Sequence, residues 1–144
     1  KVFTWSEDTK NWQQRGNVTT EWDLRTDDLH RYMQQGYYVS LSGEYLAVGR
    51  LESKINLVSD TTSTKLITQV YKWDETEWVQ LGKTIDKDIY FDESSGDQLP
   101  LKSVVIKGGI LAIGSESSVD VYSWNEASSE WTPRMIELET PEDV

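Results

Sequence analysis

A pair of tryptophans recurs three times along the chain. The stretches VFTWSEDTKNWQQRG, VYKWDETEWVQLG and VYSWNEASSEWTPRM begin at Val2, Val70 and Val121, and each places a valine and an aromatic residue ahead of its first tryptophan. The six tryptophans are Trp5, Trp12, Trp73, Trp78, Trp124 and Trp131. Self-similarity of this kind is typical of architectures built from repeated units, so it constrains the fold more than any other feature of the sequence.

Two further segments of the chain also match each other. Residues 38–50 read YVSLSGEYLAVGR and residues 103–115 read SVVIKGGILAIGS, and they align residue for residue, with glycine turns at Gly43 and at Gly108-Gly109. The polar run LESKINLVSDTTSTK at 51–65 follows only the first of them. We therefore expect an inserted loop at 51–65, although its alternation would also let the hairpin continue outward as a β-arm that pairs with a neighbour.

The residue pattern of the central repeat predicts β-strands. Tyr71 and Trp73 fall on one face and Val70 and Lys72 on the other, as the two-residue period of a strand requires. β-Branched and aromatic residues dominate these runs, with Asp-Glu, Ser-Gly and Gly-Gly between them as turns. The expected strands span residues 69–74, 77–82, 102–107 and 110–115. No stretch has a convincing helical period, so we predict an all-β chain.

Four-stranded antiparallel units with one aromatic signature each are typical of β-propeller blades. A β-sandwich is the rival fold, but a sandwich does not require its strands to repeat in sequence. We predict a single β-repeat domain of about two and a half four-stranded antiparallel repeats. Its parts are a half-open unit at 1–50, the inserted loop at 51–65, a full unit at 66–115, a partial unit at 116–136 and an acidic tail at 137–144.

So few blades would leave unpaired strand edges at both ends. Propellers close with about four to eight blades, so we expect an incomplete ring or part of a larger propeller. Open edges carry unpaired backbone groups that invite pairing with another strand. We therefore expect an oligomer or a fragment, in which either copies of this chain or further blades of a longer polypeptide cover these edges.

The repeat resembles a known family. The runs VYKWDETEWVQLGKTID, DESSGDQLP and SVVIKGGILAIGS are similar to the FG-GAP-like, integrin-type β-propeller repeats of diatoms, other algae and marine bacteria. The matching residues of the central repeat are Tyr71, Trp73, Trp78, Gln80, Leu81, Gly82, Asp86, Gly96, Asp97, Val104, Leu111, Ala112, Ile113 and Gly114. Those of the first repeat are Phe3, Trp5, Trp12, Gly16, Val39, Ser40, Leu41, Ser42, Leu46, Ala47, Val48 and Gly49. The resemblance implies a propeller architecture and no single activity.

Integrin-type repeats often carry a calcium loop. The nearest match here is DKDIYFDESSGD, in which Asp86, Asp88 and Asp92 are present but the glycine after the third carboxylate is missing. Calcium requires about six to eight oxygen ligands folded tightly around one ion, which usually demands that glycine. We therefore favour a solvated acidic loop over a calcium site, and we predict no other cofactor.

Composition argues against several partners. Twenty-five acidic residues against 14 basic ones give a net charge of -11, which repels nucleic acid and anionic lipid surfaces. No apolar run approaches the roughly 18 residues of a membrane span, so we expect no membrane insertion. The chain has no cysteine, and therefore no disulfide or thiolate zinc site. The acidic balance slightly favours an extracellular or secretory location.

The tryptophans allow two interpretations. Exposed rings would stack on a sugar or hold a cation, whereas buried rings would pack between blades. We favour packing, because packing recurs in every blade while a binding site usually needs one special blade. Trp22 lies outside the repeat, in the polar stretch TTEWDLRTDD, and is the aromatic residue we expect to contact a partner.

No catalytic signature accompanies the repeats. His30 is the only histidine, no Gly-x-Ser-x-Gly motif occurs, and the many carboxylates single out no glycosidase pair. We therefore predict a protein that is not an enzyme but a scaffold or protein-interaction module, assembling with further blades or with copies of itself. A carbohydrate-binding module that uses Trp22 is the alternative, followed by a glycan hydrolase.

Overall fold

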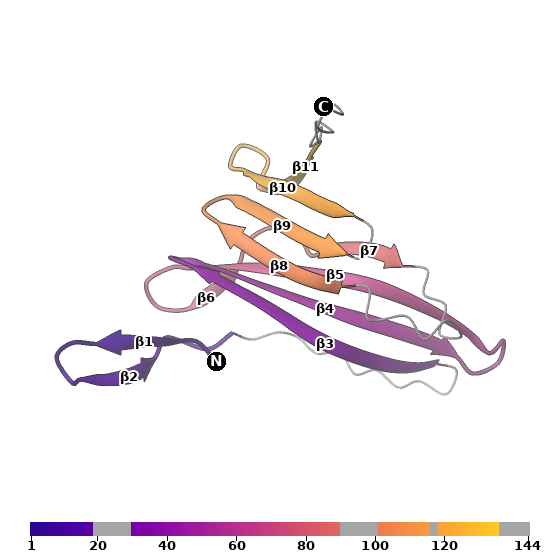
Figure 1. The fold of residues 1–144 in the computed structure, drawn as a ribbon, viewed down its shortest axis with the longest axis horizontal. Coiled ribbons are helices and arrows are strands. Elements are labelled where there is room, and N and C mark those ends of the chain that lie inside the picture. Colours follow the sequence, from indigo (N-terminus) through magenta and orange to yellow (C-terminus); the bar gives the residue numbers. More distant parts are fainter. Residues whose placement is uncertain (19–29, 90–100, 116–117, 136–144) are drawn as a thin grey trace, which may run out of the picture.

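The fold is built from β-strands. The computed structural model describes residues 1–18, 30–89, 101–115 and 118–135, of which 30–37 and 101–102 are described by their backbone alone. Within these ranges there are eleven strands and no helix (Figure 1). The predicted all-β class is therefore confirmed.

The strands form three sheets. The N-terminal hairpin contains β1 (Phe3–Ser6) and β2 (Asn11–Gln14). The central sheet contains β3 (His30–Ser42), β4 (Tyr45–Asn56), β5 (Thr61–Trp73), β6 (Trp78–Gln80) and β7 (Ile85–Ile89). The C-terminal sheet contains β8 (Leu101–Lys107), β9 (Ile110–Ser115), β10 (Val119–Asn125) and β11 (Glu130–Arg134).

Consecutive strands are antiparallel neighbours in both larger sheets. Their orders are β3-β4-β5-β6, with β7 beside the outer part of β5, and β8-β9-β10-β11. Each sheet therefore ends on a hairpin that carries a tryptophan pair. The unit expected at 66–115 straddles both sheets, because β5 and β6 belong with the strands before them. The described strands form no closed ring.

Glycine makes two of the hairpin turns. Gly43 joins β3 to β4 with a φ of 59°, and Gly108 joins β8 to β9 with a φ of 52°. These values lie in the left-handed region, which glycine adopts without the steric cost that a Cβ atom would add. Both turns were expected from the sequence, and both are confirmed.

The segment 51–65 is strand on both sides of a short turn, not the inserted loop that its polarity suggested. β4 and β5 continue through residues 51–56 and 61–65 and stay paired in one register along their length. Asn56 begins the turn, because its Oδ1 accepts backbone N–H bonds of 2.9 and 3.0 Å from the turn. The alternation of this segment therefore extends the hairpin as an arm.

The central sheet has apolar side chains on both faces. Ala47 and Leu51 of β4 join a buried cluster shared with the C-terminal sheet. Leu46 and Val48, one position out of step, join a second cluster that includes Val2 ahead of β1. The shared cluster consists of Ala47, Leu51, Leu66, Val70, Val104, Ile106, Leu111, Ile113 and Trp131. The two-residue period thus gives one sheet two packing surfaces.

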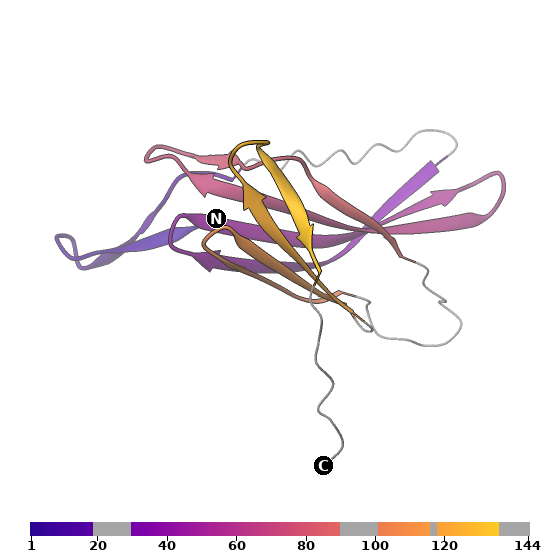
Figure 2. The ribbon, with the colours of Figure 1, turned by 90° about the horizontal axis from the view of Figure 1, so that it is seen from above.

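The two faces of the central sheet are covered to different extents. The C-terminal sheet lies along one face, whereas the N-terminal hairpin projects beyond one end of the sheet (Figures 1 and 2). The backbone N–H of Ile106 donates to Ser40 Oγ at 3.0 Å across the interface between the two larger sheets. The opposite face is contacted by the ends of the hairpin and its flanking residues.

Candidate functional site

The N-terminal hairpin meets the central sheet at a tryptophan pair. Trp73 on β5 and Trp78 on β6 are cross-strand partners, and their ring centroids lie 5.4 Å apart. Trp78 Nε1 donates to the backbone carbonyl of Arg15 at 2.8 Å, and the Arg15 guanidinium lies 4.9 Å from the centroid of the Trp73 ring. Gly16 fits against the same rings, since a Cβ atom there would lie 2.6 Å from Trp73 Cζ3.

The central sheet meets the C-terminal sheet in the same way. Trp124 on β10 and Trp131 on β11 are cross-strand partners with centroids 5.4 Å apart. Trp131 Nε1 donates to the carbonyl of Leu81 at 2.9 Å, and a Cβ atom at Gly82 would lie 2.7 Å from Trp124 Cζ3. We call each arrangement a tryptophan joint: a tryptophan pair on one hairpin, closed by a carbonyl and a glycine from the preceding hairpin.

The glycine of each joint is required for two reasons. Gly16 and Gly82 have φ angles of 67° and 75°, in the region where a Cβ atom is costly. Both also touch an indole ring more closely than any other residue could. Each follows the second tryptophan of its own repeat by four positions, and in the third repeat Met135 stands there instead.

The first tryptophan pair is open. Trp5 and Trp12 are cross-strand partners like the other two pairs, with centroids 5.6 Å apart. Trp12 is 62% exposed, whereas its counterparts Trp78 and Trp131 are 5% and 9% exposed. Packing of the rings is therefore what the structure shows at the second and third pairs but not at the first.

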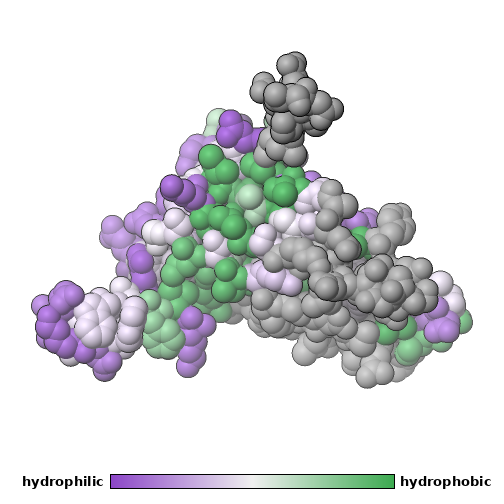
Figure 3. All heavy atoms as spheres, viewed as in Figure 1, coloured by the Kyte–Doolittle hydropathy of each residue, from purple (hydrophilic) through white to green (hydrophobic). Residues whose placement is uncertain are grey.

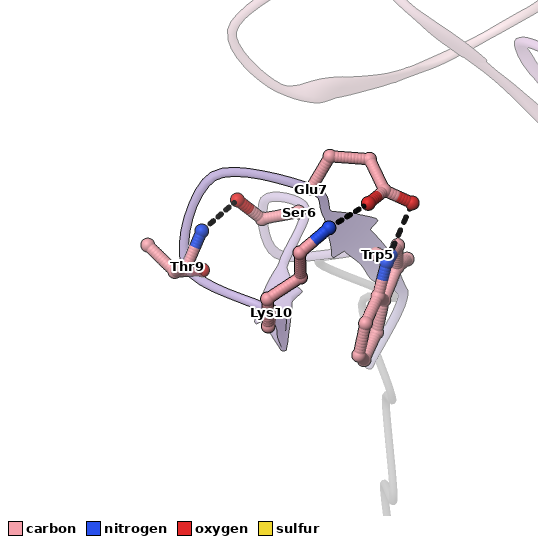
Figure 4. Close-up of polar contacts among 5 residues, drawn as sticks. All are labelled: Trp5, Ser6, Glu7, Thr9 and Lys10. Carbon is pink, nitrogen blue, oxygen red and sulfur yellow. Dashed lines mark hydrogen bonds and ion pairs between the residues drawn. The ribbon is translucent and has the colours of Figure 1, made fainter.

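The open pair is held by contacts within its own hairpin. Trp5 Nε1 donates to Glu7 Oε1 at 3.0 Å, and Lys10 Nζ contacts the other carboxylate oxygen of Glu7 at 2.6 Å (Figure 4). Ser6 Oγ accepts a hydrogen bond from the Thr9 backbone N–H at 3.3 Å. These local bonds order the turn and hold the Trp5 ring to it.

A side-chain carboxylate organises the turn of the second pair. Asp74 Oδ1 accepts hydrogen bonds from the backbone N–H of Glu77 and of Thr76, at 2.8 and 2.9 Å, and from the Thr76 hydroxyl at 2.8 Å. These bonds, the one from Glu77 first, lower the pKa of Asp74 because they favour the charged form. Asn125 forms the matching turn in the third pair through its Oδ1.

Two of the three acidic residues considered for calcium lie on a strand rather than in a loop. Asp86 and Asp88 are two residues apart on β7 and both face Lys65 of β5, with Nζ–O distances of 2.9 and 3.7 Å. Hydrogen bonding to Asp86 and the charges of both carboxylates raise the pKa of Lys65. Asp92 lies outside the described residues. Within the described part of the chain, no cluster of three or more metal-ligating side chains occurs.

One open groove lies beside the joint formed by Trp124 and Trp131. Its volume is about 330 Å³, and Lys83, Asp86, Tyr122 and Glu130 are among its lining residues. Glu130 pairs with Lys83 at 3.2 Å and Asp86 pairs with Lys65, so each acid of the groove already has an ammonium partner. Burial, followed by the charge of Asp120, raises the pKa of the Tyr122 hydroxyl. We find no catalytic arrangement in this groove.

Two residues singled out from the sequence stay predictions. Trp22 lies outside the described residues, and His30 is placed on β3 by its backbone alone. The sequence also carried a signal whose role was missed: a glycine four positions after the second tryptophan in two of three repeats. Its function as the closing element of the next joint becomes visible only when hairpins far apart in sequence meet.

Comparisons with known proteins add no information on this site. No family model, no curated protein and no solved structure matches this chain. Among the described residues there is also no helix with the length and apolar character of a membrane span.

Proposed function

We propose that this protein is a non-catalytic β-propeller-type scaffold or protein-interaction module, which assembles with further blades or with copies of itself. The central sheet, through β3-β4-β5-β6, and the C-terminal sheet each contain a four-strand meander, and these meanders would be its blades. The observation that carries this proposal is the exposure of apolar side chains at both ends of the row of sheets, at positions that are buried in its middle.

At the N-terminal end the exposed positions lie on β3. Val39 and Leu41 are 68% and 52% exposed, whereas their counterparts in the C-terminal sheet, Val104 and Ile106, are 5% and 2% exposed. Val104 and Ile106 are buried because the central sheet covers them. A further sheet in front of β3 would cover Val39 and Leu41 in the same way.

At the other end the outer face of the C-terminal sheet is open. Val105 and Val119 are 54% and 62% exposed. In Figure 3 apolar residues gather over the region of β8, β9 and β10 and continue toward one end of the central sheet. Thr68, the counterpart of Val119 in the central sheet, is fully buried. Contiguous apolar surface on a soluble protein commonly marks an interaction site, which supports a neighbour on this face.

Light scattering and thermal unfolding of the isolated chain test the proposal. We expect concentration-dependent association, or a monomer that unfolds broadly because its end faces lack their neighbours. Val119→Glu should weaken association, while Val58→Glu, at a 78% exposed turn position away from both faces, should not. A stable monomer with one sharp unfolding transition at every concentration would contradict the proposal.

A further inference from the structure

The N-terminal hairpin carries a tryptophan joint without its closing residues. Trp5 and Trp12 have the cross-strand register and ring spacing of the two complete joints. The complete joints are closed from the preceding hairpin, by Arg15-Gly16 and by Leu81-Gly82. Within the described ranges, no carbonyl accepts from Trp12 Nε1. The two filled joints therefore serve as templates for what the open one would bind.

The same hairpin also lacks two strands. β5 pairs with β4 on the side away from β6, and β10 pairs with β9 on the side away from β11. β1 occupies the equivalent position, but among the described residues it pairs with β2 alone. Two strands added to β1 would lie against β3 in the way that β3 and β4 lie against β8. They would therefore cover Val39 and Leu41.

We propose that the N-terminal hairpin is the docking site for a β-sheet unit of the same repeat, which supplies two strands to β1 and a glycine-bearing strand end to Trp5 and Trp12. This inference rests on the proposed function and specifies its partner. The partner has a glycine in the left-handed conformation four positions after a tryptophan, and the carbonyl before that glycine accepts from Trp12 Nε1. The docking surface continues the interface already formed by the two complete joints.

The third repeat of a second copy does not meet these requirements. Its residue at the closing position is Met135, which is 95% exposed and has a side chain where the complete joints have none. The strands that pair with β5 and β10 in the complete sheets are β4 and β9, and in a second copy both already have neighbours on their two sides. A charge of -11 on each copy adds repulsion. The occupant is therefore a separate repeat unit whose closing residue is glycine.

An extended chain tests the proposal. A second copy of residues 66–119, which carries Gly82 and the strands β8 and β9, is joined ahead of Lys1 of the full chain. Both the original and the extended protein are labelled with 5-fluorotryptophan, and Trp12→Phe identifies the Trp12 signal by ¹⁹F NMR. We expect Trp12 to show the solvent isotope shift of an exposed ring in the original chain and to lose it in the extended one.

Variants of the added copy separate this inference from the proposed function. Gly82→Ala in the added copy should restore the exposed signal of Trp12, whereas Gly108→Ala there should not. If Trp12 is equally buried with both, a unit docks without the glycine and the inference fails, although the proposed function stands. If the original chain already buries Trp12 by self-association, the occupant is a second copy and the inference is overturned.

A peptide in trans covers the case in which the extended chain does not fold. The peptide with the sequence of residues 70–83 is added in excess to the intact chain, and should shift the Trp5 and Trp12 signals alone. The Gly82→Ala peptide should leave both signals in place. The proposal is overturned if the unchanged peptide shifts neither tryptophan signal and the extended chain either leaves Trp12 exposed or does not fold.

Discussion

Replacing the glycine of a joint by alanine should cost more than the same change at an open glycine with the same backbone conformation. Gly82 and Gly108 both have positive φ angles, of 75° and 52°. A Cβ atom at Gly82 would lie 2.7 Å from Trp124 Cζ3 and 3.2 Å from Trp131 Cδ1, whereas at Gly108 nothing lies within 4 Å. The pair Gly82→Ala and Gly108→Ala therefore separates backbone strain from loss of the joint.

The magnitudes follow from these two contributions. Alanine in the left-handed conformation costs about 1–2 kcal/mol, and both variants share that term. Gly82→Ala adds overpacking, since Trp124 is held against Trp131 and cannot retreat freely, and insertion into a packed site costs about 1–3 kcal/mol. We therefore expect a loss of about 2–5 kcal/mol for Gly82→Ala and about 1–2 kcal/mol for Gly108→Ala.

Urea unfolding followed by circular dichroism measures the difference. With a slope of about 1–3 kcal/mol per molar urea, the extra loss in Gly82→Ala lowers the unfolding midpoint by roughly 1 M relative to Gly108→Ala. Tryptophan fluorescence should change at the same midpoint. Equal losses in the two variants, or a larger loss in Gly108→Ala, would show that the close approach to Trp124 contributes nothing, and the joint would lose its energetic role.

Three further predictions concern the joints and their surroundings. Trp78→Phe should lower the free energy of unfolding by about 1–3 kcal/mol, because the Arg15 carbonyl loses its donor, while Trp12→Phe should change it by no more than about 0.5 kcal/mol. Similar losses from both variants would contradict the difference in burial between the two rings. In urea unfolding, Val104→Glu should lower the free energy of unfolding by several kcal/mol and Val39→Glu by much less, because only the change at Val104 buries a charge. A stable Val104→Glu variant would refute the assignment of Val104 to the core. NMR titration should give Asp74 a pKa below the usual value of an aspartate, so the stability that Asp74 contributes is present at neutral pH and is lost as pH falls through that lowered pKa. An ordinary or raised pKa would mean that the hydrogen bonds of the turn do not persist in solution.

The strands and turns of this protein follow from short-range pattern. Tyr71 and Val70 were assigned to opposite faces from alternation, and they belong to the two separate clusters of the central sheet. Gly43 and Gly108 were expected in turns, and both have the left-handed backbone that a tight turn requires. These features depend on neighbours a few residues away, which is why one sequence suffices to predict them.

The features that the sequence did not predict depend on pairing between distant segments. The polar composition of residues 51–65 favoured a loop over the β-arm that their alternation also allowed. The pairing of β4 with β5 forms the arm, and Ser53 Oγ and Thr64 Oγ1 lie 2.9 Å apart across it. In the sequence, Asp86 and Asp88 resemble part of a cation-binding loop. In the structure β7 pairs with β5, and both carboxylates contact Lys65. Polarity alone does not distinguish a solvated loop from a solvated strand.

The repeated joint gives the row of sheets a direction. Each joint consists of two unlike halves, a tryptophan pair and the glycine end that precedes it, so a row of sheets has a tryptophan half open at one end and a glycine half at the other. In this chain the first end keeps its tryptophans, while the glycine position of the last is occupied by Met135. The bulk of that side chain blocks the close approach that Gly16 and Gly82 allow. In the assembly that we propose, a further unit docks through a complete joint at the N-terminal hairpin, whereas Met135 leaves the C-terminal sheet without the glycine half of such a joint.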